Sequence, residues 1–286
     1  MYNDVPLVSV CVITYNSSIF ILETLESVKE QTYKNIELVI SDDCSTDNTV
    51  DICREWVQKY RMHFANVIIV TSDYNTGISA NCNRCYKAAN AEWIKGIAGD
   101  DLLVPNCIED FVHFVETNRD VKIVSSMIDV FGDDIRNYDW YDKWYDFLDT
   151  KPNGCLQYKA LLTMNYIPAV SVFMRKSLWE CIGGFDESIK LLEDWPMWLK
   201  ITGKGTPFYF LRKRLTIYRC HNGSIQMSNR IKLAILLCRF KYIYKLHDVP
   251  YLYSLHQIEK NTFWEILLIK TYFFISVLLD KINYGK

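Results

Sequence analysis

Short apolar runs alternate with helical patterns along the first 120 residues, and this alternation most constrains what the chain can fold into. The runs cover residues 7–13, 36–41, 66–71 and 93–98, and each has the length of a buried strand. Strands that alternate with helices form right-handed crossovers and a mainly parallel sheet. The sequence therefore predicts an open α/β fold with helices flanking the sheet.

Later segments follow this alternation less closely. A strand is predicted for residues 121–131 and another for residues 170–174, followed by a short helix that ends at Gly183 and Gly184. Residues 132–153 are rich in Asp, Tyr and Trp and contain few aliphatic residues. This composition predicts an active-site loop or lid and not a core element.

The composition changes again after residue 229. Residues 230–286 contain nine Lys or Arg and four Asp or Glu, interleaved with aromatic and aliphatic residues. Their longest uncharged run, Thr271–Leu279, is shorter than the ~20 residues of a membrane-spanning helix. We expect a domain over residues 1–229 and a helical extension over 230–286. Two interpretations of this extension are open. It is an amphipathic helix on a membrane surface, or it is a helix packed on its own domain or on a partner.

Charge and cysteine content suggest the compartment. The net charge of -2 provides no drive toward nucleic acid, so no nucleic-acid partner is expected. The N-terminus lacks the basic start and apolar stretch of a secretory signal. Ten cysteines in so long a chain, several inside apolar patterns, are typical of free thiols in a reducing cytoplasm. We expect a cytoplasmic protein, with the inner membrane face as a site of peripheral attachment.

Two pairs of adjacent aspartates directly follow predicted strands. Asp42 and Asp43 end the second run, and Asp100 and Asp101 end the fourth. Parallel sheets bind ligands just beyond the carboxyl ends of their strands. Four carboxylates at one edge repel one another unless a cation, a sugar hydroxyl or a base donor neutralises them. The pairs therefore predict a site for a metal ion and a polar ligand.

The order of short motifs is similar to that of family 2 glycosyltransferases, which are inverting enzymes with a GT-A fold. The resemblance covers roughly residues 7–225. It rests on residues 8–16, 37–47, 75–77, 98–101, 183–187, 193–194 and 218–221. It implies a nucleotide-sugar donor, an acceptor hydroxyl, and Mn²⁺ or Mg²⁺ as the cofactor. A Rossmann dinucleotide site is disfavoured because the turn after the first strand contains no glycine.

The resemblance implies a set of residues that bind the nucleotide-sugar. These residues are Thr14, Tyr15, Asn16, Asp43, Gly77, Asn83 and Asp100. Asp43 matches the aspartate that accepts a hydrogen bond from the base, usually the imide N–H of uracil. As an alternative, Asp43 is a turn or cap residue before Ser45, and Gly77 belongs to a simple turn.

The second aspartate pair matches the metal-binding motif of the family. The resemblance implies that Asp101 is the direct ligand and that Asp100 binds the ribose or shares the ion. Ala98 stands where many relatives carry a further aspartate, which puts ribose recognition in doubt. His221 is a further candidate ligand, although a lone histidine is more often an ordinary surface or core residue.

The pair Glu193–Asp194 matches the catalytic carboxylate motif, and the resemblance implies that Asp194 removes a proton from the acceptor hydroxyl. Its aromatic surroundings suit this role, because partial desolvation raises the basicity of a carboxylate. Asp194 alternatively caps a helix over residues 195–201, and Glu193 is the alternative base.

The acceptor is expected to be a glycan or a lipid-linked saccharide, as in the assembly of bacterial surface polysaccharides. Candidate contacts lie in the aromatic segment 132–168 and beside the catalytic pair. They are Trp140, Trp144, Glu193 and Trp195. A binding protein that retains the GT-A fold without catalysis is the alternative function.

Overall fold

The computed structural model describes residues 5–132, 140–149, 152–189, 191–221, 231, 234–235 and 238–244. The chain divides into two compact units, Met1–Ile231 and Lys232–Lys286. Within the second unit, residues Arg239–Tyr244 form a π-helix, η4. Most of the predicted C-terminal extension lies outside the described residues, so its helical character and its boundary stay predictions.

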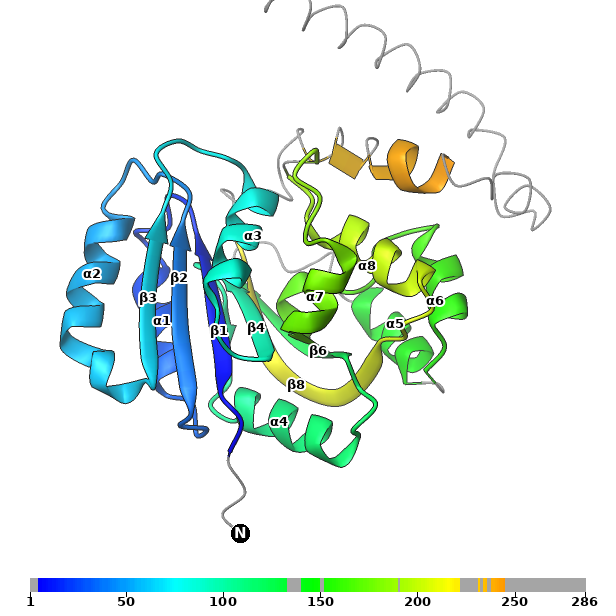
Figure 1. Cartoon of the computed structure of the whole chain (residues 1–286), viewed down its shortest axis with the longest axis horizontal. Helices are drawn as coiled ribbons and strands as arrows, with labels where there is room; N and C mark the ends of the chain where they lie inside the picture. Colours follow the sequence, from blue (N-terminus) through cyan, green and yellow to red (C-terminus); the bar gives the residue numbers. More distant parts are fainter. Residues whose placement is uncertain are drawn as a thin grey trace, which may run out of the picture. The chain divides into compact units, whose positions relative to one another are not determined.

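One sheet organises the first unit (Figure 1). Its strands are β1 (Val8–Thr14), β2 (Ile36–Asp42), β3 (Asn66–Thr71), β4 (Trp93–Ala98), β5 (Leu102–Leu103), β6 (Ile123–Gly132), β7 (Val172–Arg175) and β8 (Tyr209–Cys220). Their order in space is β3-β2-β1-β4-β7-β6-β8-β5.

The sheet is parallel in its first half and mixed in its second half. Strands β3, β2, β1 and β4 pair in parallel, as do β6 and β8. The pairs β4–β7, β6–β7 and β5–β8 are antiparallel. The predicted open α/β sheet is confirmed, and its parallel character is concentrated where strands and helices alternate in the sequence.

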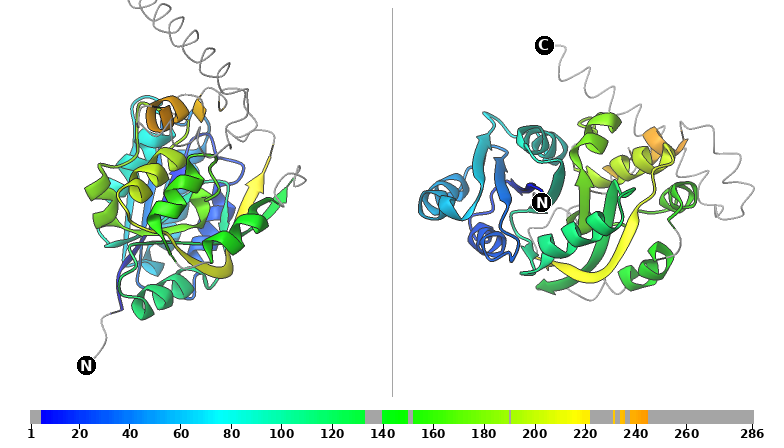
Figure 2. Two further views of the ribbon diagram at one scale, coloured as in Figure 1. Left: turned by 90° about the vertical axis from the view of Figure 1, so that its right-hand side faces the viewer. Right: turned by 60° about the horizontal axis from the view of Figure 1, so that its bottom comes forward.

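Helices lie on both sides of this sheet (Figures 1 and 2). They are α1 (Ile21–Lys29), α2 (Thr49–Tyr60), α3 (Ile78–Ala88), α4 (Cys107–Thr117), α5 (Trp140–Leu148), α6 (Gly154–Leu161), α7 (Lys176–Ile182) and α8 (Asp194–Gly203), with short 3-10 turns η1 (Arg61–His63) and η2 (Ala169–Ser171). In the described part of the chain, no helix has the length and apolar character needed to cross a membrane.

Aromatic stacking joins the two halves of the sheet. The ring of Phe173 on β7 stacks on Trp93 of β4 and on Phe111 of α4, with ring centroids 4.9 and 5.0 Å apart. These large buried rings lie where the parallel pairing gives way to antiparallel pairing. Burial of such apolar area supplies the main favourable free energy of folding.

The segment 132–153 contains a helix, so the prediction of a loop was wrong over α5. Tyr145 and Leu148 are each 2 % exposed. The hydroxyl of Tyr145 accepts a hydrogen bond from the backbone N–H of Ile128 at 3.0 Å. Tyr145 and Leu148 therefore pack inside the domain, as core residues do. The predicted end of α7 is confirmed, because Gly183 adopts a left-handed φ of 81° that favours glycine.

Candidate active site

The carboxyl ends of β1, β2 and β4 bring the two aspartate pairs to one edge of the sheet. Thr14 pairs with Asp42, and the N–H of Asp43 donates to the carbonyl of Thr14 at 3.1 Å. On the other side, the N–H of Gly99 donates to the carbonyl of Ile13 at 2.9 Å. We call this edge the rim.

Asp42 stabilises the rim itself. Its carboxylate accepts hydrogen bonds from the hydroxyl of Thr14 at 2.9 Å and from the backbone N–H of Ser45 at 2.8 Å. Thr14 is only 1 % exposed. The side chain of Thr14, predicted to line the nucleotide, therefore points into the structure, because its hydroxyl is needed to hold Asp42.

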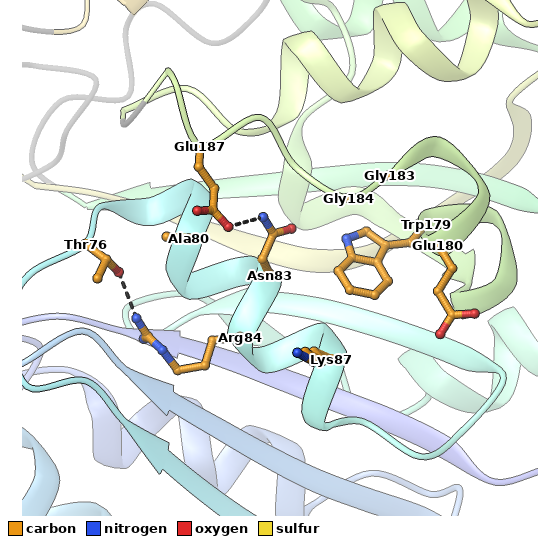
Figure 3. Close-up of a pocket in the computed structure, with 10 residues that line it drawn as sticks. All are labelled: Thr76, Ala80, Asn83, Arg84, Lys87, Trp179, Glu180, Gly183, Gly184 and Glu187. Carbon is orange, nitrogen blue, oxygen red and sulfur yellow. Dashed lines mark hydrogen bonds between the residues drawn. The ribbon is translucent and has the colours of Figure 1, made fainter.

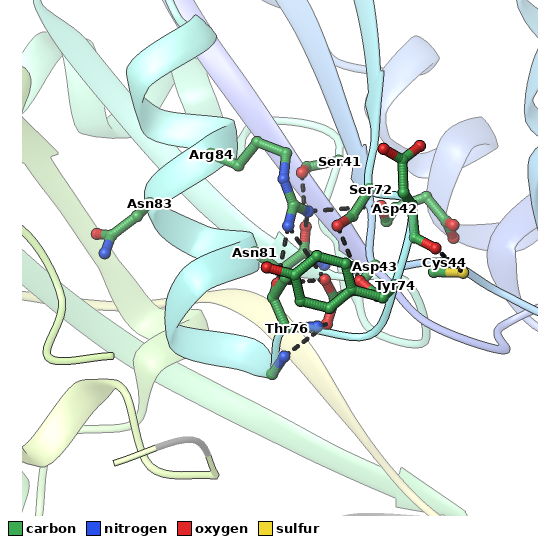
Figure 4. A network of polar contacts seen from close by, with 12 residues as sticks. Ser41, Asp42, Asp43, Cys44, Ser72, Tyr74, Thr76, Asn81, Asn83 and Arg84 are labelled. Carbon is green, nitrogen blue, oxygen red and sulfur yellow. Dashed lines mark hydrogen bonds and ion pairs between the residues drawn. The ribbon is translucent and has the colours of Figure 1, made fainter. Parts of the chain in front are cut away.

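Asp43 lies at the centre of a polar network (Figure 4). Its carboxylate, 2 % exposed, accepts from the backbone N–H groups of Thr76 at 2.9 Å and Gly77 at 2.7 Å. Arg84 of α3 donates to it at 3.2 Å. Gly77 has a φ of 92° and precedes α3, so glycine suits this turn. The nucleotide roles of Asp43 and Gly77 stay predictions.

Arg84 was not predicted to be a functional residue. In the sequence it lies between Cys82 and Cys85. Its guanidinium contacts Asp43, the hydroxyl of Thr76 at 2.8 Å and the amide oxygen of Asn81 at 2.9 Å. It places a cation where the predicted base-binding carboxylate lies. The only sequence feature that indicated a position of Arg84 near the rim was the helical pattern that follows Gly77.

Tyr15 and Asn16 follow β1 at the rim. Tyr15 is 47 % exposed, which leaves its ring accessible to a ligand. Asn16 adopts a φ of 50°, and its amide oxygen accepts the N–H of Thr46 at 2.8 Å. Asn16 therefore ties the loop after β1 to the loop before α2, and both Tyr15 and Asn16 are exposed at the rim.

Asn83 lies on a different side of α3 from Arg84. Figure 3 shows Asn83 turned toward Glu187 and Arg84 turned toward Thr76. The amide of Asn83 donates to the carbonyl of Phe185 at 3.0 Å and accepts the N–H of the same residue at 2.8 Å. Because these bonds hold the loop after α7, the structure gives Asn83 a structural position in place of the predicted nucleotide contact.

A cleft of about 610 Å³ runs over α3 (Figure 3). Its walls include Thr76 and Arg84 at one end and Trp179 and Gly184 at the other. It adjoins the network around Asp43 through Arg84, but Asp194 is not among its lining residues. The cleft therefore does not contain the predicted catalytic residue.

Strand β8 brings His221 to the second aspartate pair. The Nε2 atom of His221 lies 2.9 Å from Oδ2 of Asp100. Asp101 is 2 % exposed, and its Oδ1 atom accepts the backbone N–H of Arg219 at 2.9 Å. The side chain of Arg219 bonds to the carbonyl of Asp100 and to Glu23, at 2.8 and 2.6 Å.

The donor set fits a divalent cation in part. Among the described residues, no group of three or more His, Cys, Asp or Glu is arranged to hold a metal. Asp100 and His221 are 2.9 Å apart, and two neighbouring ligands of an octahedral ion at ~2.1 Å lie about 3 Å from each other. Burial, and then the charge of Asp100, raises the pKa of Asp101 well above its usual range. Asp100 and His221 thus form one pair with ligand-like spacing, and Asp101 as the direct ligand stays a prediction.

Asp194 is the first residue of α8 and is 9 % exposed. Its Oδ1 atom accepts the N–H of Trp195 at 2.6 Å, and its Oδ2 atom accepts the amide of Asn165 at 2.7 Å. Burial raises the pKa of Asp194 to about 6, although these two hydrogen bonds act in the opposite direction. Burial, and then the charge of Asp194, raises the pKa of Glu193 to about 8.

Helix α3 is hydrogen-bonded to Asp43 and to the segment that precedes α8. Burial raises the pKa of the Cys82 thiol, and the next contributions come from the charges of Glu193, Asp194 and Asp43, among others. The hydroxyl of Ser79 donates to the carbonyl of Ile189 at 2.8 Å, which connects α3 to the segment before α8. Helix α3 therefore contacts Asp43 through Arg84 and the segment that precedes α8 through Ser79.

The predicted acceptor residues are placed differently from one another. Trp195 is 3 % exposed and its indole N–H donates to the carbonyl of Leu161 at 2.7 Å, so this residue packs inside the domain and does not face an acceptor. Trp144 stacks on Tyr166, with centroids 4.7 Å apart. Trp140 begins α5, but its side chain lies outside the described residues.

A parallel half-sheet with acidic residues at its rim, together with a buried carboxylate at the start of α8, is the arrangement expected of a sugar-transferring GT-A enzyme. The model of the family described as "Glycosyl transferase family 2" matches residues 9–182, more than half of the chain. The chain therefore belongs to glycosyltransferase family 2.

Relatives and solved structures agree with this class. The chain is 31 % identical over 231 residues, 79 % of its length, to 82 % of the Escherichia coli "UDP-Glc:alpha-D-GlcNAc-diphosphoundecaprenol beta-1,3-glucosyltransferase WfaP". It is 27 % identical to the Bacillus subtilis "Putative teichuronic acid biosynthesis glycosyltransferase TuaG", over 91 % of this chain and 98 % of that protein.

The fold is shared with two solved glycosyltransferases. S. aureus TarS 1-349 in complex with UDP-GlcNAc matches with a TM-score of 0.63 and 22 % identity, over 81 % of this chain. This chain spans 65 % of that TarS chain. The mannosyltransferase PcManGT from Pyrobaculum calidifontis, in complex with GDP-Man and Mn2+, matches with a TM-score of 0.65 and 17 % identity, over 99 % of this chain and 77 % of that one. These similarities confirm the predicted GT-A fold.

Proposed function

We propose that this glycosyltransferase moves a sugar from a UDP-sugar to an acceptor hydroxyl in a single displacement that inverts the anomeric carbon. The observation that carries the proposal is the position of Asp194. Its carboxylate is buried, and both of its oxygens are held by hydrogen bonds. Asp194 begins α8, and the segment before α8 is bonded to α3, the helix that also contacts Asp43. A buried carboxylate that is held by two hydrogen bonds supports its proposed role in proton removal.

Asp194 acts as the general base. With a pKa near 6 it is ionised at neutral pH, yet it is more basic than an exposed aspartate. It accepts the proton of the acceptor hydroxyl while that oxygen attacks the anomeric carbon and the diphosphate oxygen leaves on the opposite face. This in-line path inverts the configuration and depends on accurate placement of the three reacting atoms.

The donor nucleotide is held at the rim. Tyr15 offers an exposed ring on which a base can stack, and the network of Asp43 and Arg84 offers a carboxylate and a cation beside it. The names of WfaP and of the TarS complex support uridine, whereas PcManGT was solved with GDP-Man. Donor tests therefore include both nucleotides.

Asp100 and His221 would hold the divalent cation, Mn²⁺ or Mg²⁺, with Asp101 behind them. When bound, such a cation neutralises the charge that develops on the leaving diphosphate. The backbone N–H of Arg219 keeps Asp101 in place, and the salt bridge from Arg219 to Glu23 fixes the end of β8. The protein thereby positions its own ligands before a donor arrives.

The acceptor is proposed to be a lipid-linked saccharide used in surface-polysaccharide assembly. The names of WfaP and TuaG, which concern a diphosphoundecaprenol-linked sugar and teichuronic acid, support this class of acceptor. Such an acceptor would be used at the inner face of the membrane. The membrane contact predicted for residues 230–286 falls mostly on residues outside the described part and stays a prediction.

The proposal is tested by turnover of an Asp194→Asn variant, after a thermal-shift screen of UDP- and GDP-sugars with Mn²⁺ has identified the donor. We expect kcat to fall by about 10²- to 10⁴-fold, because an amide cannot take up the proton. The KM for the donor should stay nearly unchanged. A variant that keeps its turnover but loses donor affinity would show that the base is misassigned. Donor binding by the wild type without any transfer or hydrolysis would favour a binding protein.

A further inference from the structure

Three hydrogen bonds attach the segment 161–167 to helix α8. The indole N–H of Trp195 donates to the carbonyl of Leu161 at 2.7 Å, and that of Trp198 donates to the carbonyl of Ile167 at 3.0 Å. Between them, the amide of Asn165 donates to Oδ2 of Asp194 at 2.7 Å. The two outer bonds fix the backbone of the segment. The middle bond reaches the carboxylate that we propose as the base.

The amide of Asn165 is not explained by packing alone. Its Oδ1 atom is buried, and among the described residues it has no hydrogen-bond partner. An unsatisfied buried acceptor destabilises the folded state. An apolar side chain of similar size would avoid this cost, so stability does not require an amide at this position. Such exceptions to hydrogen-bond pairing call for a functional explanation.

Asn165 is also the side-chain partner of Asp194 that a substitution can remove. The other bond to this carboxylate comes from the backbone N–H of Trp195. With a donor on each oxygen, the plane of the carboxylate is fixed, and the lone pairs not used by these donors keep a constant direction. A neutral amide also holds the base without competing for the proton that the base must take up.

The segment leads to the aromatic residues on the predicted acceptor side. Tyr166, next to Asn165, is fully buried and stacks on Trp144 of α5 with an interplanar angle of 18°. Its hydroxyl donates to the carbonyl of Gln157 in α6 at 3.1 Å. Helices α5 and α6 are therefore connected through Tyr166 to the residue that holds the base.

We propose that Asn165 is a positioning residue that orients the Asp194 carboxylate toward the acceptor hydroxyl. It also connects this carboxylate, through the neighbouring Tyr166, to helices α5 and α6. This inference rests on the proposed role of Asp194 as the base. Asn165 itself does not touch the reacting atoms. Its effect appears in the turnover of bound substrates and not in the affinity for the nucleotide.

The test compares Asn165→Ala and Asn165→Asp with Thr163→Val as a matched control. Thr163 is an exposed residue of the same segment whose hydroxyl bonds to the carbonyl of Ala160, so its substitution should leave activity unchanged. In Asn165→Ala we expect kcat to fall by about 10- to 100-fold, as misplacement of a catalytic group does. The KM for the donor should not change.

The pH profile separates positioning from a merely structural role. Loss of the amide removes a hydrogen bond that lowers the pKa of Asp194, so the acidic limb of the kcat profile should move to higher pH in Asn165→Ala. It should move further in Asn165→Asp, because a second carboxylate disfavours the charged form of the first. An unchanged kcat and an unchanged limb in a folded Asn165→Ala variant would overturn the proposal.

A double variant separates this inference from the proposed function. In an Asp194→Asn background, Asn165→Ala should produce no further loss, because the residue acts through Asp194. An additional loss of the full single-variant size would overturn the inference while leaving the base assignment intact. Normal turnover in Asp194→Asn alone would instead overturn the proposed function. If neither Asn165 variant folds, as judged by circular dichroism, the residue is structural and the inference fails.

Discussion

Identical carboxylates at the rim differ in the donors that face them. Asp42 is engaged by Thr14 and Ser45 in a turn, and Asp101 accepts a backbone N–H from Arg219. Asp100 faces a histidine ring. The chemical role of each aspartate therefore depends on its partners. A motif of adjacent aspartates does not by itself distinguish the metal ligand from its structural neighbour.

We predict that kcat rises with pH through a value near 6 in the wild type. Burial raises the pKa of Asp194, so the protonated form persists to higher pH than for an exposed aspartate, and only the ionised form accepts a proton. Initial rates at saturating donor and acceptor between pH 5 and pH 8 would measure this rise. Below the pKa of Asp194 we expect kcat to fall about tenfold per pH unit. A flat profile over this range would contradict the assignment.

The metal ligands are predicted to be separable by mutation. Asp100→Asn and His221→Gln should each raise the Mn²⁺ concentration for half-maximal activity by at least about tenfold, because each removes or weakens a ligand. Asp101→Asn should have a smaller effect, because its amide oxygen still accepts the N–H of Arg219. Mn²⁺ binding to the free enzyme, measured by electron paramagnetic resonance, gives a readout independent of turnover. If Mn²⁺ binding were unchanged in both Asp100→Asn and His221→Gln, these two residues would be excluded as ligands.

At the scale of elements, a buried carboxylate joins the amino-terminal ends of the strands. Glu37 on β2 is fully buried and accepts from the hydroxyl of Ser9 at 2.6 Å and from Asn66 at 3.0 Å. The backbone and the side chain of Asn90 each donate to it at 2.7 Å. Burial alone would raise the pKa of Glu37, but these hydrogen bonds lower it. Glu37 thus connects β1, β2, β3 and the turn before β4.

We predict that Glu37→Gln lowers the free energy of unfolding by about 3 kcal/mol at pH 7. The NH₂ group of the new amide would face the groups of Ser9, Asn66 and Asn90 that donate hydrogen bonds to Glu37. The pKa of Glu37 is lower in the folded than in the unfolded state, so its stabilisation is present above the unfolded value near 4.5. It is lost as the pH falls through the lowered folded-state value. Urea unfolding of both proteins from pH 7 to pH 3 should show the difference shrinking over that interval; a constant difference would contradict this account.

Elements with a clear period were predictable, and irregular ones were not. The strands β1, β2 and β4 consist of near-continuous apolar runs, because parallel strands inside a sheet are covered on both faces. Strand β8 was missed: exposed residues Arg212, Lys213 and Arg214 interrupt its pattern, and its register with β6 shifts at Met127. Strand β5 has only two residues. These strands depend on their neighbours more than on their own sequence.

At the scale of the whole molecule, the two halves of the sheet contribute different residues to the proposed site. The parallel half ends at the rim with Asp43 and Asp100, and it contains the elements that sequence patterns predict most clearly. The mixed half contributes His221 through β8, while α8 and the segment before η2 contribute Asp194 and Asn165. The residues proposed for donor recognition and catalysis thus come from elements of both halves of the sheet.

The sequence alone determined the class of fold, the family and the edge of the sheet at which the acidic motifs gather. It did so because strand period is a local property and because parallel strands end at a common edge. Only the tertiary structure decided which carboxylates are engaged and which face a ligand. The pairs Asp100–His221 and Asp194–Asn165 are 121 and 29 residues apart, so no local pattern specifies them. They form only when packing brings their elements together.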